Sequence, residues 1–182
     1  MVGIIILIIL VLIAVYIFTQ YNSFVQLKNR VEEAFATMDV YLKKRWDLIP
    51  NLVETVKGYA KHESSTLEEV VKLRNLSYDN MSLSDKIDKN QQLSKELPKI
   101  MAIAENYPEL KANQNFSDLM SQLSKIEEDI ANSRKYYNAV VRELNNKVEM
   151  FPSNLVANMF GFKKTKMFEA NENERENVKV EF

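Results

Sequence analysis

The chain begins with an unbroken apolar run, and its first 18 residues carry no charged side chain. Between Val2 and Phe18 every residue except Gly3, Ala14 and Tyr16 is Ile, Leu, Val or Phe. Side chains of these four types favour a membrane interior, and a helix of about 20 residues crosses ~30 Å of hydrocarbon. We therefore predict a transmembrane anchor over residues 1–21. Its representative lipid-facing positions are Val2, Ile4, Leu7, Leu10, Ile13 and Phe18.

The orientation of this span is predicted from the charges that follow it. Lys28 and Arg30 lie just beyond the run, and positive residues favour the cytoplasmic side of a membrane. We expect an outside N-terminus and a cytoplasmic body, although Glu32 and Glu33 offset the two positive charges. A cleaved signal peptide is the alternative, but the run has neither a basic start nor a small-x-small site after it.

Beyond the anchor, apolar positions recur at steps of three and four, which is typical of helices with one buried face. Because each apolar stripe must be covered, we predict an all-α fold. In this fold the transmembrane helix continues into an antiparallel up-and-down four-helix bundle over residues 22–152. The heptad spacing of the last helix would also support coiled-coil association, so a homo-oligomer is an alternative way to bury part of these stripes. The predicted helices cover residues 22–46, 48–78, 83–105 and 116–151.

The stretch RWDLIPNLVETVKGYAKHE decides how the first two helices are connected. Asp47 can cap a helix whose third position is Pro50, where a missing amide hydrogen costs little. We therefore predict a helix break at Asp47 and Pro50. The alternative is one kinked helix, which we expect to place the end of the last helix far from the membrane.

Composition limits the chemistry that the chain can perform. Lys and Arg number 24 against 25 Asp and Glu, so the chain lacks the positive surface that nucleic acid requires. It has no cysteine, and its one histidine, His62, lacks the second histidine that a zinc-protease or di-iron motif needs. We predict no enzyme activity, no metal and no cofactor. Glu63 lies on the buried stripe and needs a partner, for which we expect Arg134.

Two long segments of the sequence resemble those of a known protein family. RVEEAFATMDVYLKKRWDLIPNLVETVKGYAKHE, and AENYPELKANQNFSDLMSQLSKIEEDIANSRKYYNAVVRELNNKVEMFPSNLVANMFGF with a tail ending KVEF, closely resemble the LemA family of bacterial membrane proteins. The resemblance implies a single-pass protein of the bacterial cell membrane with a soluble four-helix bundle and no known enzyme activity. Relatives include a protein of magnetosome membranes, and the family's genes often lie beside membrane-protease genes. Pro98 departs from the helix former usual in the family.

Residues 153–182 follow the predicted bundle and combine aromatic, aliphatic and basic side chains. Such a composition is typical of a segment that lies in a membrane surface. We predict a juxtamembrane amphipathic segment that makes a second contact with membrane lipid. Capping of the open end of the bundle by the same side chains is the alternative. The predicted contact residues are Leu155, Met159, Phe160, Phe162, Lys163, Lys164, Lys166 and Phe168.

The last residues, ENVKVEF, alternate apolar and polar positions and end on Phe182. A PDZ-like partner could take Val180 and Phe182 as an added strand, whereas a disordered terminus is the alternative. For the whole chain we predict a non-enzymatic membrane-anchored scaffold or assembly protein that acts by homo-oligomerisation and membrane-surface contact. The alternative function is a signalling or adaptor module that presents its bundle or tail to a membrane protease or receptor.

Overall fold

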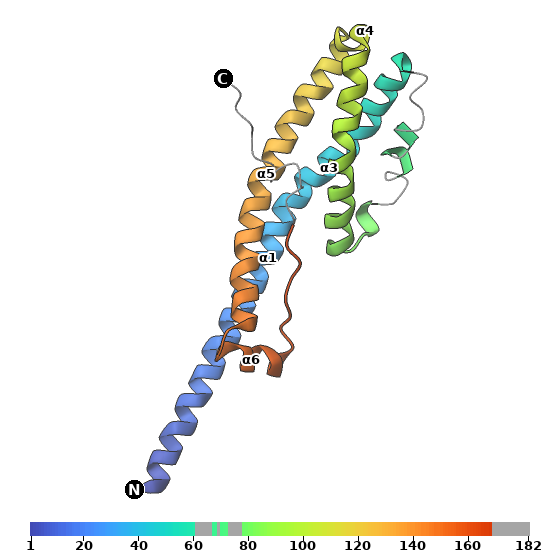
Figure 1. The fold of residues 1–182 in the computed structure, drawn as a ribbon. Helices are drawn as coiled ribbons and strands as arrows, with labels where there is room; N and C mark the ends of the chain where they lie inside the picture. The colour runs from blue at the N-terminus through green and yellow to red at the C-terminus, as the bar shows by residue number, and fades with distance from the viewer. Residues whose placement is uncertain (61–66, 69, 73–77, 169–182) are drawn as a thin grey trace, which may run out of the picture. The chain divides into compact units, whose positions relative to one another are not determined.

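The computed structural model describes residues 1–60, 67–68, 70–72 and 78–168 (Figure 1). Three long helices dominate it: α1 (Val2–Tyr59), α3 (Leu83–Asn106) and α5 (Gln114–Glu149). Shorter elements are η1 (Tyr78–Asn80), α4 (Pro108–Lys111) and α6 (Ser153–Phe160), and residues 67–68 and 70–72 are also helical. The described residues contain no strand, which confirms the all-α prediction.

The predicted helix break at Asp47 and Pro50 is wrong, because α1 runs through both residues to Tyr59. Asp47 does not cap a helix start; its carboxylate lies 3.8 Å from Lys43 Nζ, one turn earlier. A proline inside a helix costs roughly 3 kcal/mol. This cost is outweighed by the four side chains buried around Pro50, since each fully buried aliphatic side chain contributes about 1.5–3 kcal/mol. They are Leu48, Ile49, Leu52 and Val53.

The predicted second helix, 48–78, is wrong in its first part, whereas residues 67–68 and 70–72 are helical beyond the end of α1. Residues 48–59 belong to α1. His62 and Glu63 lie outside the described residues, so the expected partnership between Glu63 and Arg134 stays a prediction. Pro98 lies inside α3 without ending it, and the adjacent Leu97 is buried.

The chain divides into two compact units, each of which is described by itself. Unit 1 comprises Met1–Thr37 and Ser133–Met167, and therefore holds the start of α1, the end of α5 and α6. Three contacts join α1 to α5, and as the residue number increases along α1 the number of its partner on α5 decreases. The Lys147 ammonium donates a hydrogen bond to Ser23 Oγ, Arg30 Nη1 lies 3.3 Å from Glu143 Oε2, and the Phe35 and Tyr137 rings lie 5.8 Å apart. The two helices are thus antiparallel in unit 1.

Unit 2 comprises Met38–Asn132 together with Phe168 among the described residues. Here Asp39 and Arg45 of α1 contact Lys86 and Asn90 of α3, in the same order along both helices. These two helices therefore run parallel, whereas α5 runs antiparallel to α1, as the pairs Arg45–Glu127 and Tyr59–Asn113 indicate. These relative directions are the ones that the up-and-down bundle predicts for its first, third and fourth helices. The complete four-helix bundle stays a prediction, because residues 61–66, 69 and 73–77 lie outside the described part of the chain.

Candidate membrane-contact site

The short helix α6 is held in place at both of its ends. At its start, Ser153 Oγ donates to the carbonyl oxygens of Lys147 (2.7 Å), in the last turn of α5, and of Met150 (2.9 Å), just after it. At its end, Gly161 has a φ of 75°, a left-handed conformation that glycine adopts without strain. The amide of Phe162 then donates to Ala157 O at 2.9 Å. Local sequence thus fixes both the length and the exit of α6.

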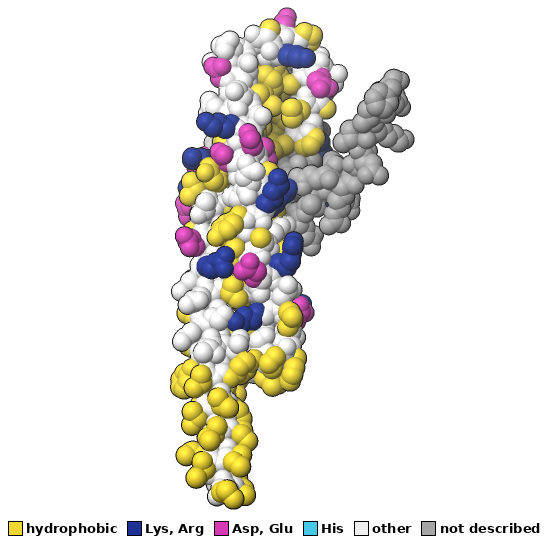
Figure 2. Space-filling view, turned by 90° about the vertical axis from the view of Figure 1, so that its left-hand side faces the viewer, with side chains coloured by type: hydrophobic (Ala, Val, Ile, Leu, Met, Phe, Trp, Pro, Cys, Tyr) yellow, Lys and Arg dark blue, Asp and Glu magenta, His cyan; other side chains and the backbone are white. Residues whose placement is uncertain are grey.

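The two faces of α6 differ in burial, and the exposed face carries large apolar side chains together with the polar Asn158. Val156 and Ala157 are buried, whereas Leu155, Met159 and Phe160 are 58%, 63% and 47% exposed. Met150 and Phe151 precede the helix and are also exposed. Figure 2 shows hydrophobic side chains covering the lower part of the molecule, over the start of α1, and a further hydrophobic cluster directly beside it. An apolar surface of this kind is typical of a contact with a membrane or a partner.

Aromatic contacts hold α6 and its exit against α1. The ring of Tyr21 lies 4.8 Å from that of Phe160 and 5.8 Å from that of Phe162, and the Phe24 and Phe162 rings stack at 4.7 Å. Residues 21–24 lie where the predicted span of residues 1–21 ends, and the first charged residue, Lys28, follows one turn later. The expectation that a continuous first helix would separate the last helix from this level is therefore wrong. It fails because α5 returns antiparallel along α1.

The segment after α6 is bound to α5 by paired hydrogen bonds. Asn145 Nδ2 donates to Thr165 O at 2.9 Å, and the Thr165 amide donates to Asn145 Oδ1 at 2.8 Å. About two turns earlier on α5, the Tyr137 hydroxyl donates to Lys166 O at 2.8 Å. Burial raises the pKa of Tyr137 to about 12. These bonds fix where the lysines of this segment emerge.

The predicted contact residues of this segment are only partly assembled on one surface. Lys163, Lys164 and Lys166 are exposed, and Lys164 Nζ lies 2.5 Å from Glu149 Oε1. Phe162 is half-buried in the aromatic cluster. Phe168 is only 3% exposed, so its expected membrane contact is wrong: the side chain is used in packing. Val180 and Phe182 lie outside the described residues.

A buried polar cluster in unit 2 was missed by the sequence analysis. The Arg45 guanidinium, 1% exposed, donates to Asn90 O and Oδ1, Ser94 Oγ and both carboxylate oxygens of Glu127, at 2.8 to 3.1 Å. The signal was present, because Arg45 continues the spacing of the buried Met38 and Leu42. A charge at such a position indicates a cross-helix partner.

Asp39 lies at the centre of a neighbouring polar group. It accepts hydrogen bonds from the Tyr78 hydroxyl and from Lys86 Nζ, each at 2.6 Å. Burial, followed by the hydrogen bond to Asp39, raises the pKa of Tyr78 well above its usual range. These groups use their donors and acceptors on one another, which makes the cluster a means of fixing α1 against α3.

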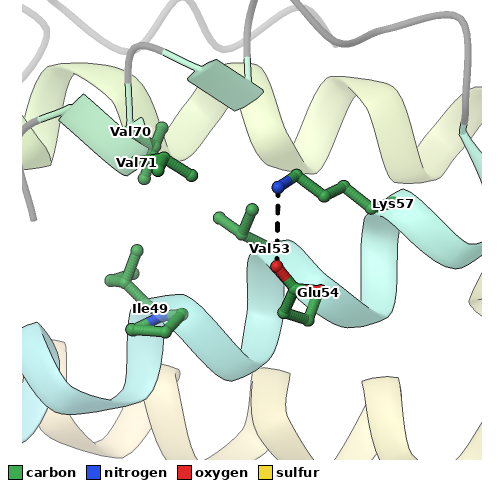
Figure 3. Close-up of a pocket in the computed structure, with 7 residues that line it drawn as sticks. Ile49, Val53, Glu54, Lys57, Val70 and Val71 are labelled. Carbon is green, nitrogen blue, oxygen red and sulfur yellow. Dashed lines mark hydrogen bonds and ion pairs between the residues drawn. The ribbon is translucent and has the colours of Figure 1, made fainter.

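Unit 2 also has a small groove beside Pro50, with a volume of about 80 Å³ (Figure 3). Ile49, Val53 and Val70 line it, and Lys57 Nζ lies 3.4 Å from Glu54 Oε1 at its edge. Within the described part of the chain, no group of three or more His, Asp or Glu side chains is placed to hold a metal ion. The groove is apolar and small, and offers no set of groups for catalysis.

The fold and this site define a class of protein: an all-helical chain whose first helix is long and apolar enough at its start to cross a membrane, with that start unburied. The described residues are thus compatible with an N-terminal membrane anchor. The chain belongs to the LemA family, whose profile matches residues 34–182. This confirms the resemblance seen in the sequence.

Individual relatives agree with this assignment. The chain is 23% identical to Protein LemA of Metamycoplasma hominis, over 86% of its own length and 72% of that protein. It is also 23% identical to Magnetosome protein MamQ 2 of Paramagnetospirillum magneticum, over 82% of its length and 65% of the relative. Magnetosome protein MamQ of Magnetospirillum gryphiswaldense matches over 82% of the chain and 64% of the relative, again at 23% identity. The chain therefore spans just under two thirds of the magnetosome proteins that it matches.

Proposed function

We propose that the protein is a non-enzymatic, membrane-anchored helical scaffold whose helix α6 lies in the surface of the membrane that residues 1–21 span. The observation that carries the proposal is the contact between Phe160 and Tyr21, with ring centroids 4.8 Å apart. It brings the exposed apolar side chains of α6 to the level at which the predicted span of residues 1–21 ends.

The energetics of α6 favour lipid as its partner. Burial of apolar surface contributes about 25 cal/mol per Å², so Leu155 and Met159 gain by leaving water. An isolated helix of this length would not form in water, but α6 is already ordered against unit 1, so binding carries little cost of ordering. Lysines beside it add about 1 kcal/mol each near an anionic surface.

The contact is tested with single-cysteine variants, because the chain has no cysteine of its own. Full-length protein carrying Met159→Cys, Leu10→Cys or Ala139→Cys is labelled with a nitroxide and reconstituted in vesicles. Ala139 is an exposed residue of α5 in the same unit and serves as the matched control. We expect labels at 10 and 159 to collide with oxygen, which concentrates in lipid, and the label at 139 to collide with a water-soluble nickel complex. A label at 159 that behaves like the label at 139 would refute the contact.

The same variants test the proposed orientation. With the N-terminus outside and the body in the cytoplasm, a membrane-impermeant thiol reagent added to intact bacteria leaves Ala139→Cys unlabelled. The reagent labels it after the cells are lysed. Labelling in intact cells would show that the body lies outside the cell, and would leave the proposed α6 contact unaffected.

Self-assembly is the remaining part of the proposal. Heptad positions of α5 such as Leu123, Ile130 and Leu144 are buried within the chain, so the support for self-assembly is the exposed apolar residues elsewhere on the helices, such as Met101 of α3 and Tyr136 of α5. The mass of the detergent-extracted full-length protein tests it. A closed assembly of many copies supports the scaffold. A monomer removes self-assembly and favours an adaptor that presents its helices to a membrane protease or another partner.

A further inference from the structure

A cavity beside α6 carries an inference that rests on the proposed membrane contact and goes one step further. It has a volume of about 250 Å³, far more than one water molecule needs. Three segments of unit 1 line it: Lys28 of α1, Leu144 of α5, and the exit of α6, represented by Phe160 and Lys163. The cavity thus combines an apolar wall with two ammonium groups.

The two lysines give the cavity a positive charge that the protein only partly neutralises. Lys28 Nζ lies 3.7 Å from Glu32 Oε1, but both side chains are more than 60% exposed, so the pair is weak. Lys163 has no carboxylate within ion-pair distance among the described residues, in contrast to Lys164, which lies against Glu149. Thr165 adds a side-chain hydroxyl to the lining. Ammonium and hydroxyl donors around one space are suited to the oxygens of a phosphate group.

The place of the cavity selects the source of that phosphate. Phe160 both lines the cavity and contacts Tyr21, the last residue of the predicted span. When residues 1–21 span the hydrocarbon, a cavity at this level opens among the lipid headgroups. We propose that it binds the phosphate of an anionic phospholipid, with Lys28 and Lys163 as its charged ligands and Phe160 and Phe162 against the start of the acyl chains.

A charge-matched pair of double variants tests the site. Lys28→Gln with Lys163→Gln removes both ligands, whereas Lys125→Gln with Lys135→Gln removes two exposed lysines of α5 and leaves the cavity intact. Native mass spectrometry of the full-length protein in detergent measures how much added phosphatidylglycerol or phosphatidylcholine each form retains. Melting curves followed by circular dichroism verify that both variants are folded.

We expect the wild type and the control to retain phosphatidylglycerol in preference to phosphatidylcholine. The cavity variant should retain on the order of tenfold less phosphatidylglycerol. Equal retention by both variants, or no preference between the two lipids in the wild type, overturns the lipid site. Inorganic phosphate that displaces the lipid at equal concentration assigns the cavity to a free anion and also overturns it.

The result is separable from that of the nitroxide experiment. If the label at 159 reports lipid while the lysine variants retain phosphatidylglycerol normally, α6 contacts the membrane without a specific headgroup site. If the label at 159 reports water, the proposed contact fails, and the headgroup site fails with it.

Discussion

The two units of the chain differ in which kinds of side chain they bury and which they expose. Unit 1 leaves large apolar residues such as Leu155 and Met159 exposed, whereas unit 2 buries the charged Arg45 to 1% exposure. An exposed apolar surface gains from a partner outside the protein, but a buried charge has to find its partners within it. The comparison separates the surface that we assign to membrane contact from the cluster that holds helices together.

The largest expected effect comes from the buried charge. Replacing Arg45 with Ala leaves the side chains of Asn90 and Glu127 without their donor. Loss of one partner from a buried ionic cluster costs about 3–5 kcal/mol, and we expect this loss in the free energy of unfolding. Denaturation of the full-length protein in detergent, followed by circular dichroism, measures it. Lys44→Ala, at an exposed neighbouring position, is the control and should change the value by less than ~0.5 kcal/mol. Similar changes in unfolding free energy for both variants would show that the Arg45 cluster does not stabilise the fold.

The next effect has the opposite sign and concerns Pro50. Inside α1, an alanine at this position supplies an amide that can donate to Trp46 O and restores a helical hydrogen bond. We expect Pro50→Ala to stabilise the protein by about 1–2 kcal/mol, after the larger freedom of the unfolded chain is taken into account. At the start of a separate helix the same change would destabilise it by roughly 0.4–1 kcal/mol. The sign of the change in unfolding free energy therefore distinguishes a continuous helix from a turn, and Pro98→Ala in α3 provides a second helical site for comparison.

Sequence periodicity was sufficient to predict the helices and the apolar start, because both depend on local patterns. It was insufficient at Pro50, where a local preference for a turn was outweighed by the buried neighbours Ile49 and Val53. The composition of α6 indicated a surface contact, but its place against Tyr21 depends on the antiparallel return of α5, which no local pattern encodes. For the same reason the burial of Phe168 could not be predicted.

A smaller effect is expected at Tyr137, the residue that binds the exit segment of α6 to α5. Tyr137→Phe removes the hydrogen bond to Lys166 O and should lower the unfolding free energy by about 1 kcal/mol at neutral pH. Burial raises the pKa of Tyr137 from 10.0 to about 12, so the folded state favours the neutral hydroxyl. Its contribution is therefore complete below pH ~10 and is lost as the pH rises toward 12. We expect the stability of the wild type to fall more steeply over this range than that of Tyr137→Phe, and parallel profiles would contradict this.

The smallest expected effect on folding concerns the exposed side chains of α6. Leu155→Gln and Met159→Gln replace exposed apolar side chains with a polar one of similar helix propensity. In detergent each should change the unfolding free energy by less than ~0.5 kcal/mol, because neither side chain packs inside unit 1. In vesicles the double variant should bring a label at Asn158→Cys, another exposed position of α6, into contact with water, since the apolar side chains that hold α6 in the membrane have been removed. A large loss of stability in detergent would instead mean that these side chains pack against a second copy of the protein. The exposed surface of α6 would then be an interface for self-assembly and not for lipid.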